Sequence, residues 1–369
     1  MRLMIDGRME SDRFGPGDGV YTYYRMLRRI GSTFPKFAVL NDRLALGIER
    51  ERPWTRAARL IRASSADSVT VDPEHPPLDI YRFAHVRFRM TRQLTRLDLA
   101  GPPGVMHWTY PLPLWIGGWR NIYTIHDALQ LGPGGLQGKA RTRQVALLQA
   151  IEARAHRLVT VSDFSRHELA GHLGWPADRI VNASIATLPP IVAPEPGNRR
   201  HGPILVLGTN GARKNIGFLL DAYIRSGISR PIMIVGPVNA YVDGLIRQYG
   251  TRPGITFTGS LTEMEISALL GRARCLAFPS LAEGFGLPIV EAMAHGCPVI
   301  CANTGAMHEV AGGAAIGFTL GNSAELVTAL QRIDGDDQLF AEYQQAGTYR
   351  TREFDDLRMR ERLSLLYQT

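Results

Sequence analysis

The sequence has few cysteines and no long apolar run, and both absences narrow the range of functions. Its 369 residues include three cysteines, Cys275, Cys297 and Cys301. No histidine spacing typical of zinc sites accompanies them, so we interpret them as small buried residues in a reducing compartment. No stretch reaches the roughly 18–20 apolar residues that span a bilayer, and no signal-peptide pattern is visible. We therefore expect a cytoplasmic protein whose contact with membranes is at most peripheral.

Positive charge is in excess, with a formal net charge of +8 and a pI near 9.6. This excess favours an anionic partner, such as a nucleic acid, a phosphorylated small molecule or an anionic membrane face. A solvated basic surface is the plainer alternative. The sequence contains no recognisable module of aromatic and basic residues for stacking bases, so we expect no nucleic-acid partner.

Residues 200–335 alternate short apolar strands with helices, and the chain is long enough for two domains. The expected strands cover 203–208, 231–236, 255–259, 275–279 and 298–302. This alternation predicts a parallel α/β sheet, in which ligands bind at the carboxyl ends of the strands. A similar but less regular pattern precedes it, with strands expected at 2–5, 121–125 and 158–161. The proline-rich segment 187–202 indicates an interdomain linker.

The segment AEGFGLPIVEAMAHG at 282–296 places two carboxylates around a glycine-rich turn. Pro288 is suited to the first position of a helix, so the preceding turn would present backbone N–H groups at the positive end of that helix. Glu283 lies before this turn and Glu291 is expected in the first helical turn. Both suit hydroxyl groups of a sugar or a ribose. The alternative is that Glu291 only complements the helix dipole and Glu283 is solvated.

A second candidate loop, GTNGARKN at 208–215, also follows an expected strand and opens a helix. Arg213 and Lys214 can reach an anion there, as a guanidinium fork and a point charge. The alternative is an ordinary basic helix start, which the helix dipole disfavours.

Two N-terminal features are weaker signals. The turn FGPGDGVY at 14–21 has three glycines that permit close approach to a phosphate, although a plain loop fits equally well. His126 follows an expected strand directly and could donate to a sugar hydroxyl, with Asp127 orienting it. A structural histidine is the alternative.

Residues 81–99 have apolar positions at helical spacing and arginines at 82, 89 and 96 on a neighbouring stripe. The pattern predicts one basic amphipathic helix. It suits either an anionic membrane surface or an ordinary domain helix whose apolar stripe faces the core.

The run EGFGLPIVE at 283–291 resembles the E-x7-E signature of retaining GT-B glycosyltransferases of family 4. Four further segments resemble that family in the same order along the chain: IDGRM with GDGVYTYYRML, TIHDALQL at 124–131, VTVSDFSRHEL at 159–169, and the RKN at 213–215. The resemblance implies an α/β GT-B fold with two Rossmann-like domains facing across a cleft. Residues 1–190 and a returning helix at 350–369 would bind the acceptor, and residues 200–349 would bind the nucleotide sugar.

The resemblance also implies a role for each matched residue. Glu291 would bind the donor ribose, and Glu283 would hold the transferred sugar. His126 would contact the sugar near the reacting carbon, while Arg213 and Lys214 would neutralise the leaving diphosphate. The remaining donor-binding positions would be Gly17, Gly19, Asn215, Gly284, Phe285, Gly286 and Leu287. Neither a metal nor another cofactor is expected, because basic groups and helix ends replace it.

We therefore expect a hexosyltransferase in cell-surface polysaccharide synthesis, at the inner face of the membrane. GDP-mannose is the first choice of donor, because the opening and TIHD segments are most similar to mannosyltransferases. UDP-glucose and GDP- or dTDP-rhamnose stay open, as does the choice between a glycan and a lipid-linked acceptor. Departures from the family pattern, at His308, Gly313 and the segment 180–190, bear on the selectivity for nucleotide base and sugar.

Two other functions remain as alternatives. A sugar-nucleotide 2-epimerase would share the two-domain architecture, but such enzymes normally lack the two-glutamate motif. A non-catalytic glycan-binding subunit is the second, and the presence of Glu283, Glu291, Arg213 and Lys214 argues against it.

Overall fold

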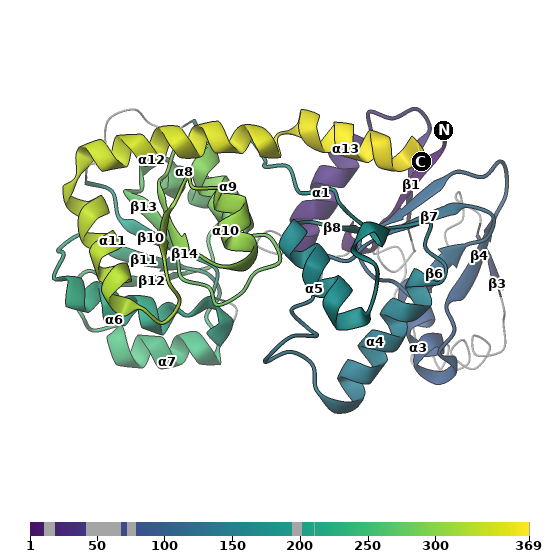
Figure 1. Ribbon diagram of the computed structural model, residues 1–369, viewed down its shortest axis with the longest axis horizontal. Coiled ribbons are helices and arrows are strands. Elements are labelled where there is room, and N and C mark those ends of the chain that lie inside the picture. The colour runs from purple at the N-terminus through teal and green to yellow at the C-terminus, as the bar shows by residue number, and fades with distance from the viewer. Residues whose placement is uncertain (11–18, 42–67, 72–78, 194–200, 210, 369) are drawn as a thin grey trace. The chain divides into compact units, whose positions relative to one another are not determined.

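The computed structural model describes residues 1–10, 19–41, 68–71, 79–193, 201–209 and 211–368. The chain forms two compact units. The first contains residues 1–185 together with 360–369, and the second contains residues 186–359. Figure 1 shows that both units are layered arrangements of helices around strands. None of the helices within these described ranges is long and apolar enough to cross a membrane.

The first unit contains a six-stranded parallel sheet in the order β2-β1-β5-β7-β8-β9. Its strands are β1 (Leu3–Asp6), β2 (Phe37–Leu40), β5 (Val105–Trp108), β7 (Arg120–Thr124), β8 (Arg157–Thr160) and β9 (Ile180–Asn182). A separate parallel sheet has the order β3-β4-β6, formed by β3 (Ser68–Val71), β4 (Thr95–Leu99) and β6 (Leu114–Ile116). The helices are α1 (Gly19–Gly31), α3 (Ile80–Thr91), α4 (Gly138–Glu152) and α5 (Asp163–Leu173), with the end of α13 (Asp356–Gln368).

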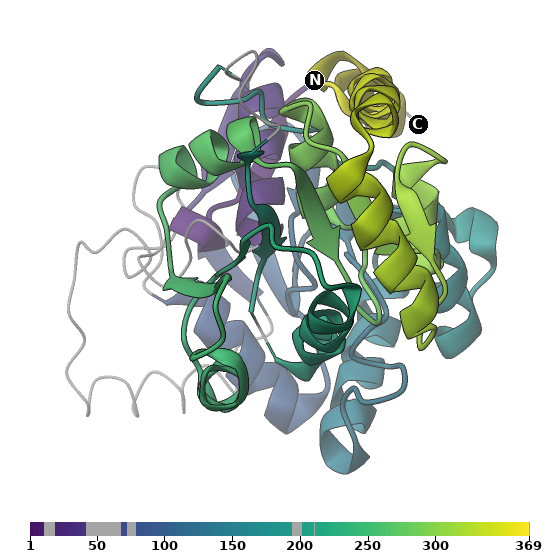
Figure 2. The ribbon, with the colours of Figure 1, turned by 90° about the vertical axis from the view of Figure 1, so that its left-hand side faces the viewer.

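The second unit contains a six-stranded parallel sheet in the order β12-β11-β10-β13-β14-β15. Its strands are β10 (Ile204–Leu207), β11 (Ile232–Val235), β12 (Ile255–Gly259), β13 (Cys275–Phe278), β14 (Val299–Ala302) and β15 (Ile316–Phe318). Its helices are α6 (Ile216–Ser226), α7 (Ala240–Tyr249), α8 (Glu263–Arg272), α9 (Leu287–Ala294), α10 (Gly305–Ala311), α11 (Ser323–Gly335) and α12 (Asp337–Arg350). Helices cover both faces of this sheet (Figure 2).

The central strands of the second unit form because they are continuous apolar runs. Every residue of β10 (ILVL), β13 (CLAF) and β14 (VICA) is buried. Parallel strands between helices have this composition because both of their faces lie in the core. Cys275, Cys297 and Cys301 are buried and unpaired within this core, as the sequence predicted.

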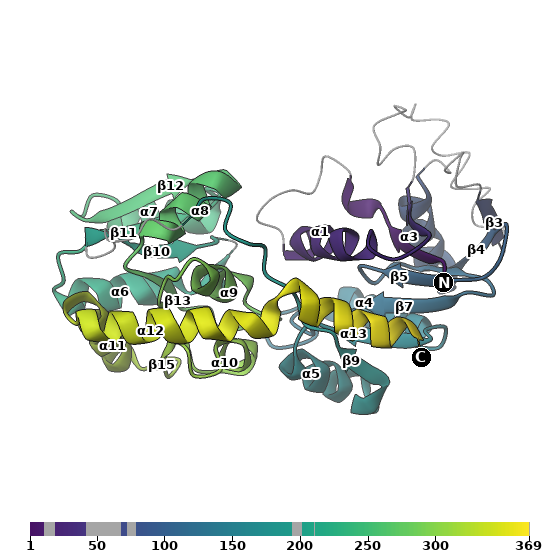
Figure 3. The same ribbon diagram turned by 90° about the horizontal axis from the view of Figure 1, so that it is seen from above.

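Local signals fix the starts of two helices. Thr262 caps α8, and Glu265 completes the capping box by accepting from the Thr262 backbone N–H at 2.7 Å. Ser162 caps α5 by accepting from the backbone N–H of Ser165. At the C-terminus, α12 and α13 follow one another with only a short 3-10 helix between them (Figure 3).

The prediction of one helix over 81–99 is wrong. Helix α3 ends at Thr91, and residues 95–99 are the strand β4. Arg92 adopts a left-handed conformation (φ 60°) that closes the helix, and its backbone N–H bonds to the carbonyl of Phe88. Buried Thr95 and Leu97 alternate with exposed Arg96, which is the period of two of a strand. The apolar residues of 81–99 also fit helical spacing, so this alternation was not recognised in the sequence. Arg96 therefore shares no helical stripe with Arg82 and Arg89.

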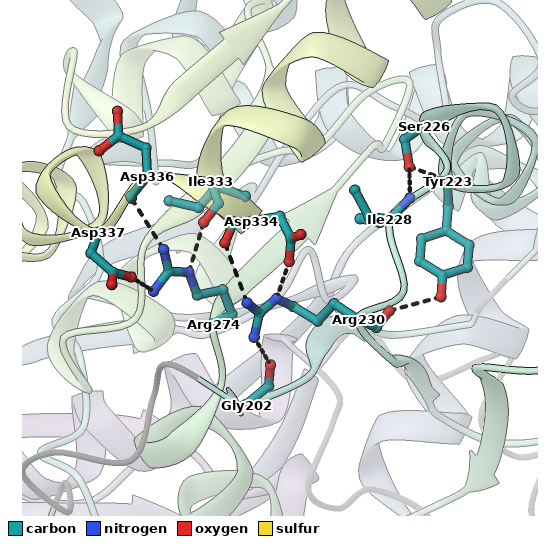
Figure 4. A network of polar contacts seen from close by, with 10 residues as sticks. All are labelled: Gly202, Tyr223, Ser226, Ile228, Arg230, Arg274, Ile333, Asp334, Asp336 and Asp337. Atoms are coloured by element: carbon teal, nitrogen blue, oxygen red, sulfur yellow. Dashed lines mark hydrogen bonds and ion pairs between the residues drawn. The ribbon is translucent and has the colours of Figure 1, made fainter.

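Two arginines that are unremarkable in the sequence, one buried and one half-buried, attach α11 and α12 to the sheet of the second unit (Figure 4). Arg274, immediately before β13, donates to the Ile333 carbonyl at 2.6 Å and pairs with Asp337 at 2.7 Å. Arg230, two residues before β11, pairs with Asp334 and donates to the Gly202 carbonyl. Such charge-assisted bonds fix the starts of both strands.

Candidate active site

The strand order of the second unit reverses between β10 and β13, and the two candidate loops of this unit follow these strands. The chain proceeds outwards from β10 through β11 to β12, then returns to place β13 on the other side of β10. In open parallel sheets, a crevice forms outside the carboxyl ends of the strands at such a reversal, and ligands bind there. The loop after β10 leads to Arg213 and Lys214, and the loop after β13 leads to Glu283.

The loop after β10 holds its conformation through glycines and side-chain bonds. Gly208 has φ 85°, and a Cβ built on it would lie 3.4 Å from Cε of Lys214. Thr209 donates to the Pro237 carbonyl at 2.7 Å and accepts at its own carbonyl from Asn239. A one-turn 3-10 helix (Ala212–Lys214) follows, and Asn215 links it to α6 with φ 54°. The loop is therefore tied to the end of the neighbouring strand β11.

The two loops are bonded directly to each other. The backbone N–H of Leu281 donates to the Arg213 carbonyl at 2.9 Å, and the Arg213 guanidinium donates to the Ala282 carbonyl. Gly286, with φ 103°, caps α9, and Phe285 packs edge-on against Phe354. The sequence predicted both loops, but it gave no signal for the bonds between them.

Arg213, Lys214 and Glu283 form one ionic cluster. Lys214 Nζ lies 2.8 Å from Glu283 Oε1, and an Arg213 guanidinium nitrogen lies 2.7 Å from Glu283 Oε2. The side chains of Lys214 and Glu283 are each 12% exposed, whereas that of Arg213 is 38% exposed. Burial alone would raise the pKa of Glu283, but Lys214 and Arg213 outweigh it and lower the pKa below its ordinary value. Glu283 is therefore ionised at neutral pH.

Glu291 lies one residue further into its helix than the sequence predicted. Helix α9 begins at Leu287, so Pro288 is its second residue and Glu291 falls in the second turn. Burial raises the pKa of Glu291 to about 7, and the negative charge of Glu263 adds to the shift. Near neutral pH this carboxyl therefore exists in both protonation states, and it can donate to a hydroxyl as well as accept from one.

In the first unit, His126 follows β7 and is held on two sides. Its Nε2 lies 2.9 Å from the Thr109 carbonyl, and its ring meets that of Tyr23 edge-on at 4.9 Å between centroids. A carbonyl oxygen can only accept, so Nε2 carries a proton and donates to it. Asp127 accepts from the backbone N–H of Leu129, which closes the turn after β7.

Behind His126 lies a buried polar chain that sequence reasoning missed. Tyr23 bonds Thr124 at 2.9 Å, Thr124 bonds His107 Nε2 at 2.8 Å, and His107 Nδ1 bonds the Tyr367 hydroxyl at 2.7 Å. Burial lowers the pKa of His107 to about 3, so its ring is neutral. Asp6, buried at the end of β1, accepts from the backbone N–H of Thr109, and burial raises its pKa to about 6.

The remaining predicted positions divide between the units. Gly284 and Leu287 accompany Phe285 and Gly286 in the second unit, at the start of α9. Gly19 is the first residue of α1, whereas Gly17 lies outside the described residues. Among those described residues, no group of His, Cys, Asp and Glu side chains is arranged to hold a metal ion.

Two family models match the chain, and between them they cover well over half of it. Residues 195–349 match "Glycosyl transferases group 1", and residues 50–181 match "Glycosyltransferase Family 4". O-antigen chain mannosyltransferase B of Escherichia coli is 33% identical over 217 residues, which are 53% of this chain and 56% of that protein. MMP alpha-(1->4)-mannosyltransferase of Mycolicibacterium hassiacum is 28% identical over 46% of this chain and 42% of that protein. The matched part thus spans about half the length of these curated relatives.

Solved structures agree on the fold. Anabaena Alr3699/HepE in complex with UDP-glucose has a TM-score of 0.68 at 16% identity, with both chains covered in full. WaaG, a glycosyltransferase involved in lipopolysaccharide biosynthesis, has a TM-score of 0.62 at 14% identity, covering 100% of this chain and 99% of that one. With its two parallel α/β units and both family matches, the chain belongs to the group 1, family 4 glycosyltransferases and has the GT-B fold.

Proposed function

We propose that the protein is a retaining glycosyltransferase that moves a hexose from a nucleotide sugar to a glycan or lipid-linked acceptor. The donor we favour is GDP-mannose, since several relatives carry the name mannosyltransferase. The observation that carries the proposal is the cluster of Arg213, Lys214 and Glu283 beside the start of α9, where the strand order reverses. It joins two cations suited to a diphosphate with a carboxylate suited to sugar hydroxyls.

In this proposal the two cations act on the leaving group. As the bond between the sugar carbon and the phosphate oxygen breaks, its electron pair passes to the phosphate, and negative charge grows there. Arg213 and Lys214 neutralise that charge, and they are already fixed in position before the reaction, which makes such stabilisation effective. The acceptor hydroxyl attacks from the same face, and its proton passes to the departing phosphate oxygen, so configuration is retained.

Two other residues have binding roles in this proposal. Glu291 bonds the ribose hydroxyls of the donor, and its pKa near 7 allows it to accept from one and donate to another. His126 contacts the transferred sugar, and the bond from its Nε2 to the Thr109 carbonyl holds the ring in place.

A nucleotide-release assay tests the proposed function. The protein is incubated separately with GDP-mannose, UDP-glucose, UDP-GlcNAc and dTDP-rhamnose, and the free nucleoside diphosphate is measured over time. We expect slow release of GDP from GDP-mannose by the parent protein and none by the Arg213→Ala, Lys214→Ala double variant. Release from another donor would correct the choice of donor. Release from none, with and without added glycan acceptors, would reject the proposed activity, and conversion of UDP-GlcNAc to an epimer would favour the epimerase instead.

For a lipid-linked acceptor, we also propose that helix α3 contacts an anionic membrane surface. On α3, Tyr81, Ala84 and Phe88 pack into the core, whereas Arg82 and Arg89 are exposed and Met90 is 65% exposed. Arginines beside an exposed apolar side chain suit an anionic lipid surface. We expect the parent protein to co-sediment with phosphatidylglycerol vesicles at low salt, and the Arg82→Gln, Arg89→Gln double variant to bind less. Equal sedimentation of the two would reject α3 as the contact.

A further inference from the structure

In the proposed function, Arg213 and Lys214 bind the donor diphosphate. In the structure, the carboxylate of Glu283 lies between these two cations. Each of its carboxylate oxygens is paired, one with Lys214 at 2.8 Å and one with Arg213 at 2.7 Å. The carboxylate is 12% exposed and its pKa is lowered, so it is a charged partner and not a neutral hydrogen-bonding group. An incoming anion therefore meets cations that are already neutralised in part.

Contacts other than the pairs with Glu283 also hold both cations in place. Arg213 also donates to the Ala282 carbonyl, and its own carbonyl accepts from Leu281. Lys214 lies over the ring of Phe278 at 5.0 Å, and the lack of a side chain on Gly208 leaves room for its stem. An anion that approaches these two fixed cations therefore competes with the carboxylate for them.

We propose that Glu283 is an internal competitor of the donor diphosphate. Before a sugar nucleotide binds, its carboxylate pairs with Arg213 and Lys214. When a sugar nucleotide binds, the diphosphate takes these cations, and the released carboxylate turns its oxygens to hydroxyls of the transferred sugar. The inference rests on the proposed function, because that function supplies the identity of the ligand.

This competition discriminates between sugar nucleotides and free nucleotides. A sugar nucleotide offers the displaced carboxylate new donors in its sugar hydroxyls, which offset the broken ion pairs. A free nucleoside diphosphate has no sugar to offer and leaves a poorly exposed carboxylate without a partner beside a polyanion. Glu283 thus lowers the affinity for the product nucleotide, and its return to the cations assists product release.

Calorimetric titration of the Glu283→Gln variant tests the competition. The probes are GDP, UDP and inorganic pyrophosphate, and the control is Glu342→Gln, which removes a carboxylate from the exposed surface of α12 in the same unit. We expect Glu283→Gln to bind the nucleoside diphosphate roughly tenfold more tightly than the parent, the order of a desolvated charge pair. Glu342→Gln should match the parent. For the sugar nucleotide, the gain should vanish or reverse, because the glutamine is a weaker acceptor for hydroxyls.

A second variant guards against loss of folding, since Glu283→Gln leaves Lys214 without its anion. Glu283→Asp keeps the charge but shortens the side chain by one methylene, so its carboxylate cannot reach both cations. Its affinity for the nucleotide should lie between that of the parent and that of Glu283→Gln. Thermal melting establishes that each variant is folded.

Equal or weaker binding of GDP, UDP and pyrophosphate by both folded variants would overturn the competition while leaving the proposed function intact. A similar gain in Glu342→Gln would also overturn it, since the effect would then reflect net charge. Absence of binding in every protein, the parent included, would overturn the nucleotide site itself.

Discussion

Lys214 Nζ lies 2.8 Å from Glu283 Oε1, although 69 residues separate the two in sequence. They meet because β10 and β13 are neighbours in the sheet, while the chain between them forms β11 and β12 on the far side of β10. The reversal of strand order thus brings a basic loop and an acidic loop together at one edge of the sheet.

Replacing Arg213 by alanine should slow transfer more than it weakens binding. Charge on the leaving phosphate is greatest in the transition state, so loss of one fixed cation should lower kcat by about 10²-fold. Nucleotide affinity should fall less than about tenfold, because removal of the guanidinium also relieves part of the pairing that holds Glu283. Steady-state kinetics and calorimetry measure the two effects. Arg247→Ala, on the exposed face of α7, is the matched control. A drop in affinity with kcat unchanged would contradict the assignment.

Chelation of metals should leave the rate of transfer unchanged. Arg213 and Lys214 supply positive charge at the position where many transferases use a divalent ion, so the charge of the diphosphate can be neutralised by the chain itself. The measurement compares initial rates with EDTA, without it, and with Mg²⁺ or Mn²⁺ restored. A rate that falls with EDTA and returns with either ion would show that these two side chains do not suffice.

Much of the second unit could be predicted because its strands are short apolar runs with clear helix signals between them. The strands β10, β11, β12, β13 and β14 lie within one residue of the expected positions. The T-x-x-E pattern at 262–265 likewise marks the start of α8, where it forms a capping box. The segment 81–99 failed because its apolar residues fit helical spacing across a real boundary at Arg92. Periodicity alone does not detect a single left-handed residue that ends a helix.

The candidate site could be predicted as a set of residues but not as an arrangement. The motifs indicated Glu283, Arg213 and Lys214, and their roles toward a ligand remain proposals. These three side chains pair with one another because β10 and β13 are neighbours in the sheet, and no local sequence pattern predicts that strand order. Buried polar residues such as Arg274, His107 and Tyr367 were missed for a similar reason, since their partners lie 17 to 260 residues away.

The Glu291→Gln variant should change the pH dependence of stability in a defined direction. The pKa of Glu291 is raised from 4.5 to about 7 in the folded state. Below pH 4.5 the carboxyl is neutral in both states and folding carries no penalty. As the pH rises from 4.5 to 7, the unfolded chain ionises while the folded chain stays protonated, so the parent loses stability that glutamine retains, and above pH 7 the loss levels off. The free energy of unfolding of Glu291→Gln should therefore exceed that of the parent by about 2–3 kcal/mol at pH 8. Urea denaturation at pH 4.5 and pH 8 measures the difference, and a gap that does not widen would refute the raised pKa.

Replacing Tyr367 by phenylalanine should destabilise the first unit. The change removes the hydroxyl that bonds His107 Nδ1 at 2.7 Å and leaves a buried ring nitrogen without that partner. We expect a loss of about 1–3 kcal/mol in the free energy of unfolding. Tyr349→Phe, which alters a side chain on α12 that is 69% exposed, is the control and should have little effect. Equal destabilisation of the two variants in urea would mean that the bond to His107 contributes nothing.

The most direct measurement of the central claim is a crystal structure of the protein with the sugar nucleotide that the release assay identifies. The account predicts that the diphosphate oxygens lie within hydrogen-bonding distance of Arg213 and Lys214 and that Glu283 has left both cations. A nucleotide bound away from the edge formed by β10 and β13, with the pairs of Glu283 unchanged, would contradict it.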